Sequence, residues 1–341
     1  MKLALVGFGT VGQGLAEILR DRADELRQRH GLDARLVAVA TRRRGTLCCP
    51  AGLDLTALLE AAARGSLGHY PDAPGLVRDL DVPALLRASG ADALVEASPT
   101  DLTTGQPALD HCRAAFDAGL HVVLANKGPV ALAYDELRAR ASQARRRLGF
   151  EATVMAGTPA LRLALDALAG CRVLAARGVL NGTTNYILTQ MEAGLPYADA
   201  LAQAQALGYA ETDPTADVDG WDAAGKALIL ARVVFGSSLT LADLRVEGIA
   251  GLTPADIAAA RAAGERWKLV AEITPGGGRV GPLRLPLSDP LAGVAGTTNA
   301  VTYNTDLLGP VTLLGPGAGR LQTACGLLAD LLEIHKNSDK P

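Results

Sequence analysis

The first third of the chain alternates short apolar runs with longer stretches whose apolar residues recur at helical spacing. The apolar runs predict buried strands over residues 3–6, 35–41, 93–96 and 120–124. The periodic stretches predict helices over residues 11–28, 53–64, 82–88, 107–118 and 134–147. Strands that are apolar throughout and alternate with helices are typical of βαβ units. We therefore expect a parallel sheet that helices cover on both faces.

The pattern changes after residue 150. It predicts helices over residues 186–193 and 197–207, and a longer helix that begins near residue 219 and ends near residue 235. Gly/Pro turns then separate four predicted strands and a last helix, over residues 270–273, 279–285, 300–305, 311–314 and 323–334. This order predicts a mixed α+β domain. With 341 residues the chain has the length of two domains, which we place at residues 1–148, completed by the C-terminal segment 316–341, and at residues 149–315.

The composition is that of an ordinary globular protein, with 49% hydrophobic and 20% charged residues, which excludes wholesale disorder. A formal net charge of −3 gives no electrostatic reason to expect nucleic acid or an anionic membrane as a partner. No apolar run approaches the ~20 residues of a membrane-spanning helix. The five cysteines show no Cys-x-x-Cys spacing, which fits a reducing compartment. We expect a cytoplasmic protein.

A glycine-rich turn follows the first predicted strand and opens the first predicted helix. Gly7 permits the tight turn, Gly9 lets the backbone approach a pyrophosphate, and Gly12 allows close helix–strand packing. The helix N-terminus then offers N–H groups and a partial positive charge to the phosphates. Such a pattern also occurs in ordinary glycine-rich turns, but here the strand, the turn and the helix agree. We therefore predict a Rossmann-type α/β domain that binds a dinucleotide through Gly7, Phe8, Gly9, Thr10, Val11 and Gly12.

The end of the second predicted strand bears on the choice of cofactor. An Asp or Glu there would bind a ribose 2′-hydroxyl and repel a 2′-phosphate. The strand instead runs into Arg42, Arg43 and Arg44, and no acidic residue occurs between Asp33 and Asp54. Guanidinium groups match a phosphate in geometry and charge, whereas the structural alternative is a solvated basic loop. NADP(H) is favoured, and use of NAD(H) stays open.

The densest group of charged residues lies in the segment 207–226. Five carboxylates occur within twelve residues and one lysine follows, namely Glu211, Asp213, Asp217, Asp219, Asp222 and then Lys226. On a helix that begins near residue 219, Asp222 and Lys226 are i,i+4 and share a face. A lysine held by carboxylates can donate a proton to a carbonyl oxygen as hydride reaches the carbon, and the other carboxylates can bind a substrate ammonium group. The alternative is a surface ion pair with helix-capping acids, but mutual repulsion of the acids favours a cation-binding site.

Polar residues also follow two later strands, where the loops of a parallel sheet meet a cofactor. Ser98 and Thr100 follow the strand that ends at residue 96, and Lys127 follows the strand that ends at residue 124. Lys127 can contact the nicotinamide ribose or the substrate carboxylate, and its alternative is a plain exposed loop lysine. The histidines have no ligand or triad spacing, so we expect ordinary surface residues at His30, His69, His111, His121 and His335.

Together these motifs resemble the homoserine dehydrogenase family over essentially the whole chain. The resemblance is carried by the cofactor turn, an Ala-Asn-Lys element, a loop between domains, a long Asn-Gly-Thr-Thr-Asn-Tyr signature, the acidic segment and two C-terminal segments, at residues 7–12, 125–127, 151–159, 178–188, 207–226, 289–300 and 315–324. It implies NAD(P)-dependent interconversion of L-homoserine and L-aspartate 4-semialdehyde in threonine, methionine and isoleucine biosynthesis. It also implies a homodimer, with substrate binding, catalysis and dimerisation in the second domain.

Carried over position by position, the resemblance implies a role for each residue of the site. Lys226 is the proton donor, and Lys127 lies at the junction of cofactor and substrate. The substrate-binding residues are Glu211, Asp222, Asp217 and Tyr209. Gly208 and Gly319 are expected near the cofactor. A monovalent cation, usually sodium, would have only oxygen ligands, which are Glu151 and the backbone carbonyls of Val154, Ala156 and Thr158.

Two features depart from the family pattern, and two other functions compete with it. Met155 stands where the family often has glycine, which narrows the loop and affects the cation geometry. The chain ends seven residues after Ile334, so we expect no threonine-binding regulatory domain. A phosphorylating semialdehyde dehydrogenase would need a nucleophilic cysteine, and no cysteine here sits in such a motif. A non-catalytic NADPH-binding sensor would have lost the lysine and the carboxylates of the acidic segment, which are present.

Overall fold

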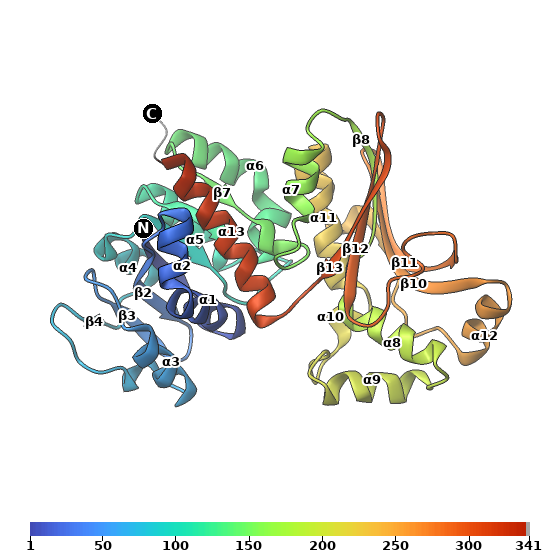
Figure 1. The fold of residues 1–341 in the computed structure, drawn as a ribbon, viewed down its shortest axis with the longest axis horizontal. Helices are drawn as coiled ribbons and strands as arrows, with labels where there is room; N and C mark the ends of the chain where they lie inside the picture. The colour runs from blue at the N-terminus through green and yellow to red at the C-terminus, as the bar shows by residue number, and fades with distance from the viewer. Residues whose placement is uncertain (339–341) are drawn as a thin grey trace. The chain divides into compact units, whose positions relative to one another are not determined.

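The computed structural model describes residues 1–338, which fold into two compact units (Figure 1). The first unit comprises Met1–Gly157 together with the C-terminal segment from Gly319. The second unit comprises Thr158–Ala318. Among the described helices, none combines the length and the apolar character that a membrane span requires.

A seven-stranded sheet with the order β4-β3-β2-β1-β5-β6-β7 forms the centre of the first unit. Its strands are β1 (Lys2–Val6), β2 (Arg35–Thr41), β3 (Gly45–Cys48), β4 (Val77–Arg78), β5 (Ala93–Glu96), β6 (His121–Leu124) and β7 (Leu148–Gly149). β1 pairs in parallel with β2 and β5, and β5 pairs in parallel with β6, which confirms the predicted parallel sheet. The antiparallel strands β3 and β4 were not predicted, because they are short and β3 follows a polar turn. Since the strand order reverses beside β1, the carboxyl ends of β1 and β5 form the switch point where such sheets bind ligands.

Six helices accompany this sheet before the chain leaves the first unit. They are α1 (Thr10–Asp21), α2 (Ala23–His30), α3 (Leu55–Ala63), α4 (Val82–Ser89), α5 (Ala108–Asp117) and α6 (Lys127–Gln143). The single helix predicted over residues 11–28 is wrong, because the backbone breaks at Arg22 with φ −116° and two helices result. The helix predicted over residues 134–147 begins earlier, at Lys127, and is kinked at Ala133. The residues before that kink belong to a separate helical segment, which the periodicity did not reveal.

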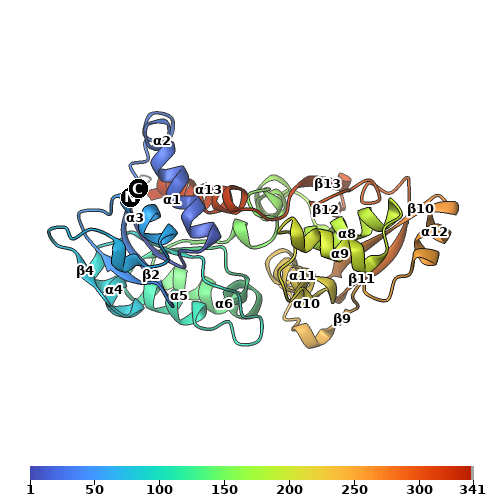
Figure 2. The same ribbon diagram turned by 90° about the horizontal axis from the view of Figure 1, so that it is seen from below.

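The last helix, α13 (Arg320–Ser338), belongs to the first unit and lies beside α1 in both views (Figures 1 and 2). Arg320 donates to the two carboxylate oxygens of Glu17 on α1, at 2.6 and 2.9 Å. The approach is close enough that a Cβ at Gly14 would lie 2.6 Å from the Arg320 carbonyl oxygen. Leu327 of α13 is fully buried in the same apolar cluster as Leu5 of β1. The C-terminal helix therefore completes the core of the first unit.

The second unit is built on a six-stranded sheet with the order β13-β12-β8-β10-β11-β9. Its strands are β8 (Val173–Val179), β9 (Leu244–Val246), β10 (Glu265–Thr274), β11 (Gly277–Pro286), β12 (Thr298–Thr305) and β13 (Gly309–Pro316). The four predicted strands correspond to β10–β13, and together with the helices they confirm a mixed α+β unit. The central strand β8, which pairs antiparallel with β10 and β12, was missed. Its exposed Leu174 and half-buried Arg177 interrupt the apolar pattern that would have marked it.

Helices pack on this sheet and carry the acidic segment. They are α7 (Ala160–Arg162), α8 (Gly182–Glu192), α9 (Tyr197–Ala206), α10 (Thr215–Val218), α11 (Trp221–Phe235) and α12 (Pro254–Ala262). α11 packs against β8, β10 and β11 (Figure 1), and residues 223–231 of this helix are all buried. It begins after Gly220, whose left-handed backbone (φ +88°) separates it from α10. α8 begins earlier than predicted because Asn181 caps it by accepting from the Thr184 N–H at 2.8 Å.

Candidate functional site

The glycine turn joins β1 to α1 at the switch point of the first sheet. Gly7 has φ +98°, and a Cβ there would lie 2.3 Å from the carbonyl carbon of Ala97, so the position requires glycine. A Cβ at Gly12 would lie 2.2 Å from the Gly7 carbonyl oxygen, because strand and helix touch there. Around Gly9, by contrast, a Cβ would meet no atom of residues 1–338 within 4 Å, and no side chain from this part of the protein caps the first turn of α1. This open space and the uncapped N–H groups fit a pyrophosphate.

The residues between the glycines differ in what they offer a ligand. Phe8 is 2% exposed and its ring packs in the core of the unit. Thr10 is exposed and Val11 is half-buried in the first turn of α1. At Phe8, therefore, only the backbone is available to a dinucleotide.

The loops after β5 and β6 are tied together beside the glycine turn. Asn126 Nδ2 donates to the carbonyl oxygens of Ser98 and Pro99, both at 3.0 Å. The Lys127 backbone N–H donates to Thr100 Oγ1 at 3.3 Å, and Lys127 is the half-buried first residue of α6. These contacts bring Ser98, Thr100 and Lys127 to the carboxyl edge of the sheet.

Arg42 and Arg43 lie in the turn of the hairpin between β2 and β3. Both are exposed, and neither side chain bonds to another residue within the described part of the chain. The hairpin adjoins the glycine turn, since the Gly7 N–H donates to the carbonyl oxygen of Ala40 in β2 at 2.9 Å. Two guanidinium groups without a protein partner thus lie at the strand end where sheets of this kind recognise the ribose 2′ position.

The expectation that the histidines are ordinary surface residues is wrong for His111. Only His69 is exposed, and the other four are half-buried. His111 Nδ1 lies 2.7 Å from Oε2 of Glu96, the last residue of β5, with side-chain exposures of 14% and 0%. The spacing of fifteen residues gave no sign of this pair, because it forms only when α5 packs beside β5.

In the second unit, Lys226 and Asp222 share one face of α11, as their spacing predicted. Lys226 Nζ lies 2.8 Å from Asp222 Oδ2 and donates to the Leu180 carbonyl oxygen at 2.7 Å. The lysine is 5% exposed. Since an ammonium group has three N–H donors, these two contacts leave one donor for a further acceptor. Lys226 is therefore a buried cation that Asp222 and the Leu180 carbonyl hold in place, and its contact with Asp222 is not a surface ion pair.

Asn181 joins the two nearest aspartates of the acidic segment. Its Nδ2 donates to Asp217 Oδ1 at 2.7 Å and to Asp222 Oδ2 at 2.9 Å. Burial and, next, the neighbouring Asp222 carboxylate raise the pKa of Asp217. One amide thus fixes both carboxylates at the N-terminus of α8.

Glu211 and Tyr209 lie in the segment between α9 and α10. Tyr209 is 45% exposed and its ring meets that of Tyr186 edge-on, with centroids 5.0 Å apart. Thr183 Oγ1 donates to the Tyr209 carbonyl oxygen at 2.8 Å. Glu211 is exposed, and among residues 1–338 its carboxylate has no hydrogen-bond or ion-pair partner. No direct bond brings Glu211 to Lys226, so its carboxylate stays open to a ligand.

The two glycines expected near the cofactor lie at helix ends. Gly208 follows α9 with φ +74°, the left-handed conformation that commonly ends a helix. Gly319 precedes α13 with φ +135°, and its carbonyl oxygen accepts from the Thr323 N–H at 2.9 Å. Both positions therefore require glycine for a structural reason that is independent of any cofactor.

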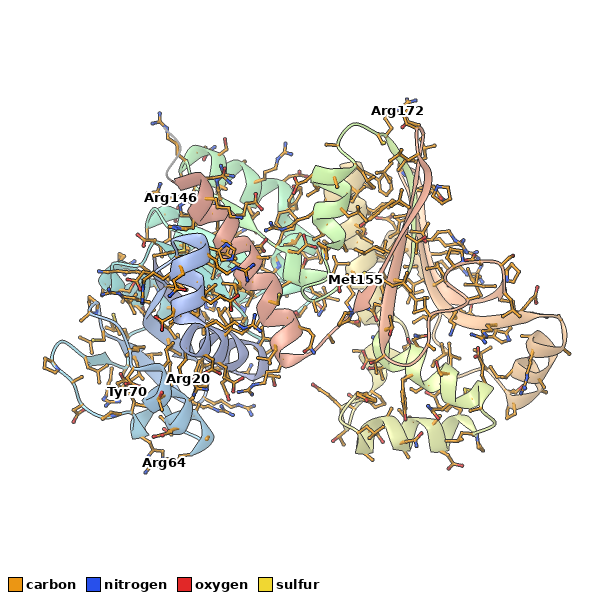
Figure 3. The ribbon with its side chains drawn as sticks, in the orientation of Figure 1. Arg20, Arg64, Tyr70, Arg146, Met155 and Arg172 are labelled. Atoms are coloured by element: carbon orange, nitrogen blue, oxygen red, sulfur yellow. The ribbon has the colours of Figure 1, made fainter. Side chains whose placement is uncertain are left out.

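The loop expected to hold a cation is largely buried. Glu151 is 3% exposed, and Met155, which Figure 3 labels, is 0% exposed. Ala156 has a left-handed backbone (φ +52°), and Thr158 Oγ1 donates to the Pro316 carbonyl oxygen at 3.0 Å. Within residues 1–338, no three His, Cys, Asp or Glu side chains are grouped so as to hold a metal ion. A cation in this loop would therefore depend on one carboxylate and backbone carbonyls.

Three groups of the site escaped sequence reasoning, namely Asn181, the Leu180 carbonyl and Glu96. Asn181 lies in the 178–188 signature, and an asparagine before a helix is a common N-cap, so its position was predictable but its two aspartate partners were not. The Leu180 carbonyl leaves no signal, since every residue has one. Glu96 is an acid directly after an apolar run, which is a usable sign of a polar role at the end of a buried strand.

Comparison with known proteins identifies the same family in both units. The family model for homoserine dehydrogenase matches residues 159–332, and that for the homoserine dehydrogenase NAD binding domain matches residues 7–151. The NAD(+)-dependent homoserine dehydrogenase of Pseudomonas canavaninivorans is 42% identical over 344 residues, which covers 99% of this chain and 97% of that protein. The homoserine dehydrogenase of Methanocaldococcus jannaschii is 40% identical over 342 residues and is matched over 100% of both chains.

Solved structures agree. A hyperthermophilic archaeal homoserine dehydrogenase in complex with NADPH has a TM-score of 0.84 at 32% identity, with 100% of this chain and 98% of that chain covered. A homoserine dehydrogenase from Thiobacillus denitrificans also has a TM-score of 0.84 at 32% identity, with 99% of this chain and 74% of that chain covered. The chain therefore belongs to the homoserine dehydrogenase family of oxidoreductases, which act on a CH–OH group with a nicotinamide cofactor.

Proposed function

We propose that Lys226 is the proton donor and acceptor in the interconversion of L-homoserine and L-aspartate 4-semialdehyde. The observation that carries this role is the buried Nζ, held by the Leu180 carbonyl and the Asp222 carboxylate with one donor left over. A bound nicotinamide supplies or accepts the hydride. Negative charge then develops on the former carbonyl oxygen, and the remaining N–H of Lys226 can neutralise it. In the oxidative direction the same nitrogen takes the alcohol proton.

We assign substrate binding to the acidic segment. Homoserine and the semialdehyde carry an α-ammonium group, and the carboxylates of Glu211, Asp217 and Asp222 attract a cation. The raised pKa of Asp217, caused by burial and by the nearby Asp222, indicates excess negative charge that an ammonium group would offset. Glu211, whose carboxylate has no partner among the described residues, is the carboxylate that we assign to this ammonium group. Tyr209, whose exposed ring packs edge-on against Tyr186, would add an aromatic surface to the substrate site.

We assign cofactor binding to the first unit and catalysis to the second. The backbone of residues 7–12 would hold the pyrophosphate, and Ser98, Thr100 and Lys127 would contact the nicotinamide end. Gly208 and Gly319 remain further proposed cofactor contacts. The space around the backbone of Gly9 and the uncapped N-terminus of α1 support the assignment of the pyrophosphate.

We propose NADP(H) as the preferred cofactor, with NAD(H) as an alternative. Among residues 1–338, no hydrogen bond or ion pair engages the Arg42 and Arg43 side chains, which favours their binding of a 2′-phosphate. The relatives differ in what their names say, since the Pseudomonas canavaninivorans protein is NAD(+)-dependent and the hyperthermophilic archaeal protein was solved with NADPH. Kinetics with both cofactors decide between them.

We propose a sodium ion bound by Glu151 and the carbonyls of Val154, Ala156 and Thr158. The Glu151 carboxylate is buried in this loop, and a carboxylate oxygen is a suitable ligand for a hard cation. Such an ion would order the loop, and it would take no part in proton transfer.

We also propose a homodimer that forms through the second unit. Several large apolar side chains are exposed on β8, β13 and the β12–β13 turn, namely Leu174, Leu307, Leu308 and Leu314. Exposed apolar groups of this kind mark contact surfaces between proteins. Sedimentation of wild type and of a Leu307→Glu, Leu308→Glu variant tests this. A monomeric wild type would contradict it.

We propose the cytoplasm as the location of the protein, because its five cysteines are all free, which fits a reducing compartment.

One assay tests the proposed activity. The purified chain is mixed with homoserine and either NADP+ or NAD+, and the reduced cofactor is followed by its absorbance. We expect its formation with wild type and its near absence with Lys226→Met. Cofactor binding without turnover in wild type would instead support a non-catalytic sensor.

A further inference from the structure

We propose that His111 is a positioning residue for the nicotinamide cofactor, acting through the buried carboxylate of Glu96 on the loop that follows β5. This proposal rests on the assignment of cofactor binding to the first unit. It gives a role to a histidine whose sequence context suggested none.

The two oxygens of Glu96 each bind one partner. Oε1 accepts the backbone N–H of Ser98 at 2.7 Å, and Oε2 lies 2.7 Å from His111 Nδ1. The Glu96 side chain is 0% exposed. A buried carboxylate needs its hydrogen bonds, because desolvation without partners is strongly unfavourable. His111 therefore supplies the second partner that keeps Glu96 in the geometry which holds Ser98.

The loop held in this way lies directly on the glycine turn. A Cβ at Gly7 would lie 2.3 Å from the carbonyl carbon of Ala97 and 2.5 Å from the nitrogen of Ser98. From the other side, Asn126 Nδ2 donates to the Ser98 carbonyl oxygen at 3.0 Å. Ser98 is thus held by its N–H, which Glu96 accepts, and by its carbonyl oxygen, to which Asn126 donates, at the switch point between β1 and β5. A shift of this loop moves Ser98, which is assigned to the nicotinamide end, and changes the packing against Gly7, although His111 itself is not assigned a ligand contact.

The reach of the histidine ring allows a sharp choice of variants. Nδ1 is adjacent to Cγ, so the amide nitrogen of asparagine can take nearly the same place. The amide nitrogen of glutamine reaches one bond further, toward the position of Nε2. His111→Asn therefore keeps the donor to Glu96, His111→Gln displaces it, and His111→Leu removes it. His121 supplies a matched control, because it is half-buried at the opposite end of the same sheet, where its Nδ1 accepts from the Arg147 N–H at 2.9 Å.

The test measures the Kd of the binary complex with NADPH and with NADH, by cofactor fluorescence, together with the Tm of each cofactor-free variant. We expect His111→Leu and His111→Gln to raise the Kd by at least about tenfold. Even a small displacement of a group that binds the ligand has a large effect on a site whose geometry is fixed. His111→Asn should stay within about threefold of wild type, as expected when the hydrogen bond is retained. His121→Leu should lower the Tm and leave the Kd unchanged. The KM for homoserine at saturating cofactor should not change in any variant.

Each other result has a defined meaning. If His111→Leu and His111→Gln bind cofactor as tightly as wild type, the positioning role is overturned. If His121→Leu weakens cofactor binding equally, the effect is general destabilisation and the role is again overturned. If His111→Leu does not fold, the comparison of His111→Asn with His111→Gln decides, and equal Kd values overturn the proposal. Failure of wild type to bind either cofactor would contradict the proposed function itself.

Discussion

The Lys226 side chain is more deeply buried than the Asp222 carboxylate with which it pairs, at 7% against 20% exposure and a separation of 2.8 Å. The ammonium group therefore faces the interior while its counter-charge lies nearer to water. Replacing the lysine by a neutral side chain of similar length leaves a partly solvated carboxylate, which is tolerable. Losing the aspartate would leave an unpaired buried cation, which is strongly destabilising. Lys226 is accordingly the residue whose chemical role can be tested without loss of the fold.

Asp217→Asn should stabilise the protein at neutral pH while it weakens homoserine binding. Burial and the neighbouring Asp222 raise the pKa of Asp217, so its ionised form is disfavoured in the folded state. For an acid with a raised folded pKa, stability is fully present below the unfolded pKa and is lost as pH rises through the folded pKa. The difference in Tm between variant and wild type should therefore be near zero at acidic pH and positive at pH 7.

Asp213→Asn is a control for which the expected change in stability at pH 7 has the opposite sign. Hydrogen bonds from the Thr215 hydroxyl and N–H lower the pKa of Asp213, so its stabilising effect is present above the unfolded pKa and is lost as pH falls. This variant should be slightly less stable than wild type at pH 7. A Tm for Asp217→Asn below that of wild type at pH 7 would contradict the account of the acidic cluster.

Glu211→Gln should raise the KM for homoserine by roughly ten- to a hundredfold, the usual effect of losing one charge-assisted contact. The Kd for NADP+ in the binary complex should stay the same, because the Glu211 carboxylate is assigned to the substrate ammonium group and not to the cofactor. Asp213→Asn, also exposed and in the same segment, should leave the KM for homoserine unchanged. An equal loss of cofactor affinity in Glu211→Gln would show a disturbed fold instead of a lost substrate contact.

Replacing Arg42 and Arg43 together by alanine should raise the KM for NADP+ by at least about tenfold and spare that for NAD+. Both side chains are exposed and make no hydrogen bond or ion pair with residues 1–338, so the fold should be unaffected. Arg64→Ala, at the exposed end of α3, is the matched control. Equal changes for the two cofactors would remove the 2′-phosphate assignment.

A bound sodium ion should make thermal stability depend on sodium at constant ionic strength. At a concentration about a hundredfold above its Kd, a ligand that binds only the folded state adds about 2.7 kcal/mol to the free energy of unfolding. We expect a higher Tm in sodium chloride than in choline chloride, and no such difference for Glu151→Gln. If wild type has the same Tm in both salts, the cation site is not present.

Much of the fold was predictable because apolar patterns report burial. The parallel strands β1, β2, β5 and β6 and the helix α11 appear as continuous or periodic apolar runs. The break between α1 and α2 at Arg22 was not predictable from the sequence. The apolar residues of the two helices follow one helical periodicity, and only the backbone conformation of Arg22 separates them. The strand β8 was hidden for the opposite reason, since a central strand of a mixed sheet keeps Arg177 half-buried by ion pairs to Glu272 and Asp289.

The site shows the same division between local and non-local information. The i,i+4 spacing of Asp222 and Lys226 is local, so their contact was predictable from the helix alone. The Leu180 carbonyl, which Lys226 contacts from forty-six residues away, is not local. The same holds for the pair of His111 and Glu96. Spacing identifies chemistry within one element, whereas contacts between elements need the packed structure.

The most direct test of the central claim is single-turnover reduction of L-aspartate 4-semialdehyde by reduced cofactor in Lys226→Met. Methionine keeps the length and packing of the side chain but provides no proton and no charge. We expect a folded variant with the cofactor affinity of wild type and a rate reduced by at least ~10²–10⁴-fold. A rate above about one tenth of wild type would limit the contribution of Lys226 to less than ~1.4 kcal/mol of the barrier. That result would contradict general-acid catalysis by Lys226 and would make Lys127 the better candidate.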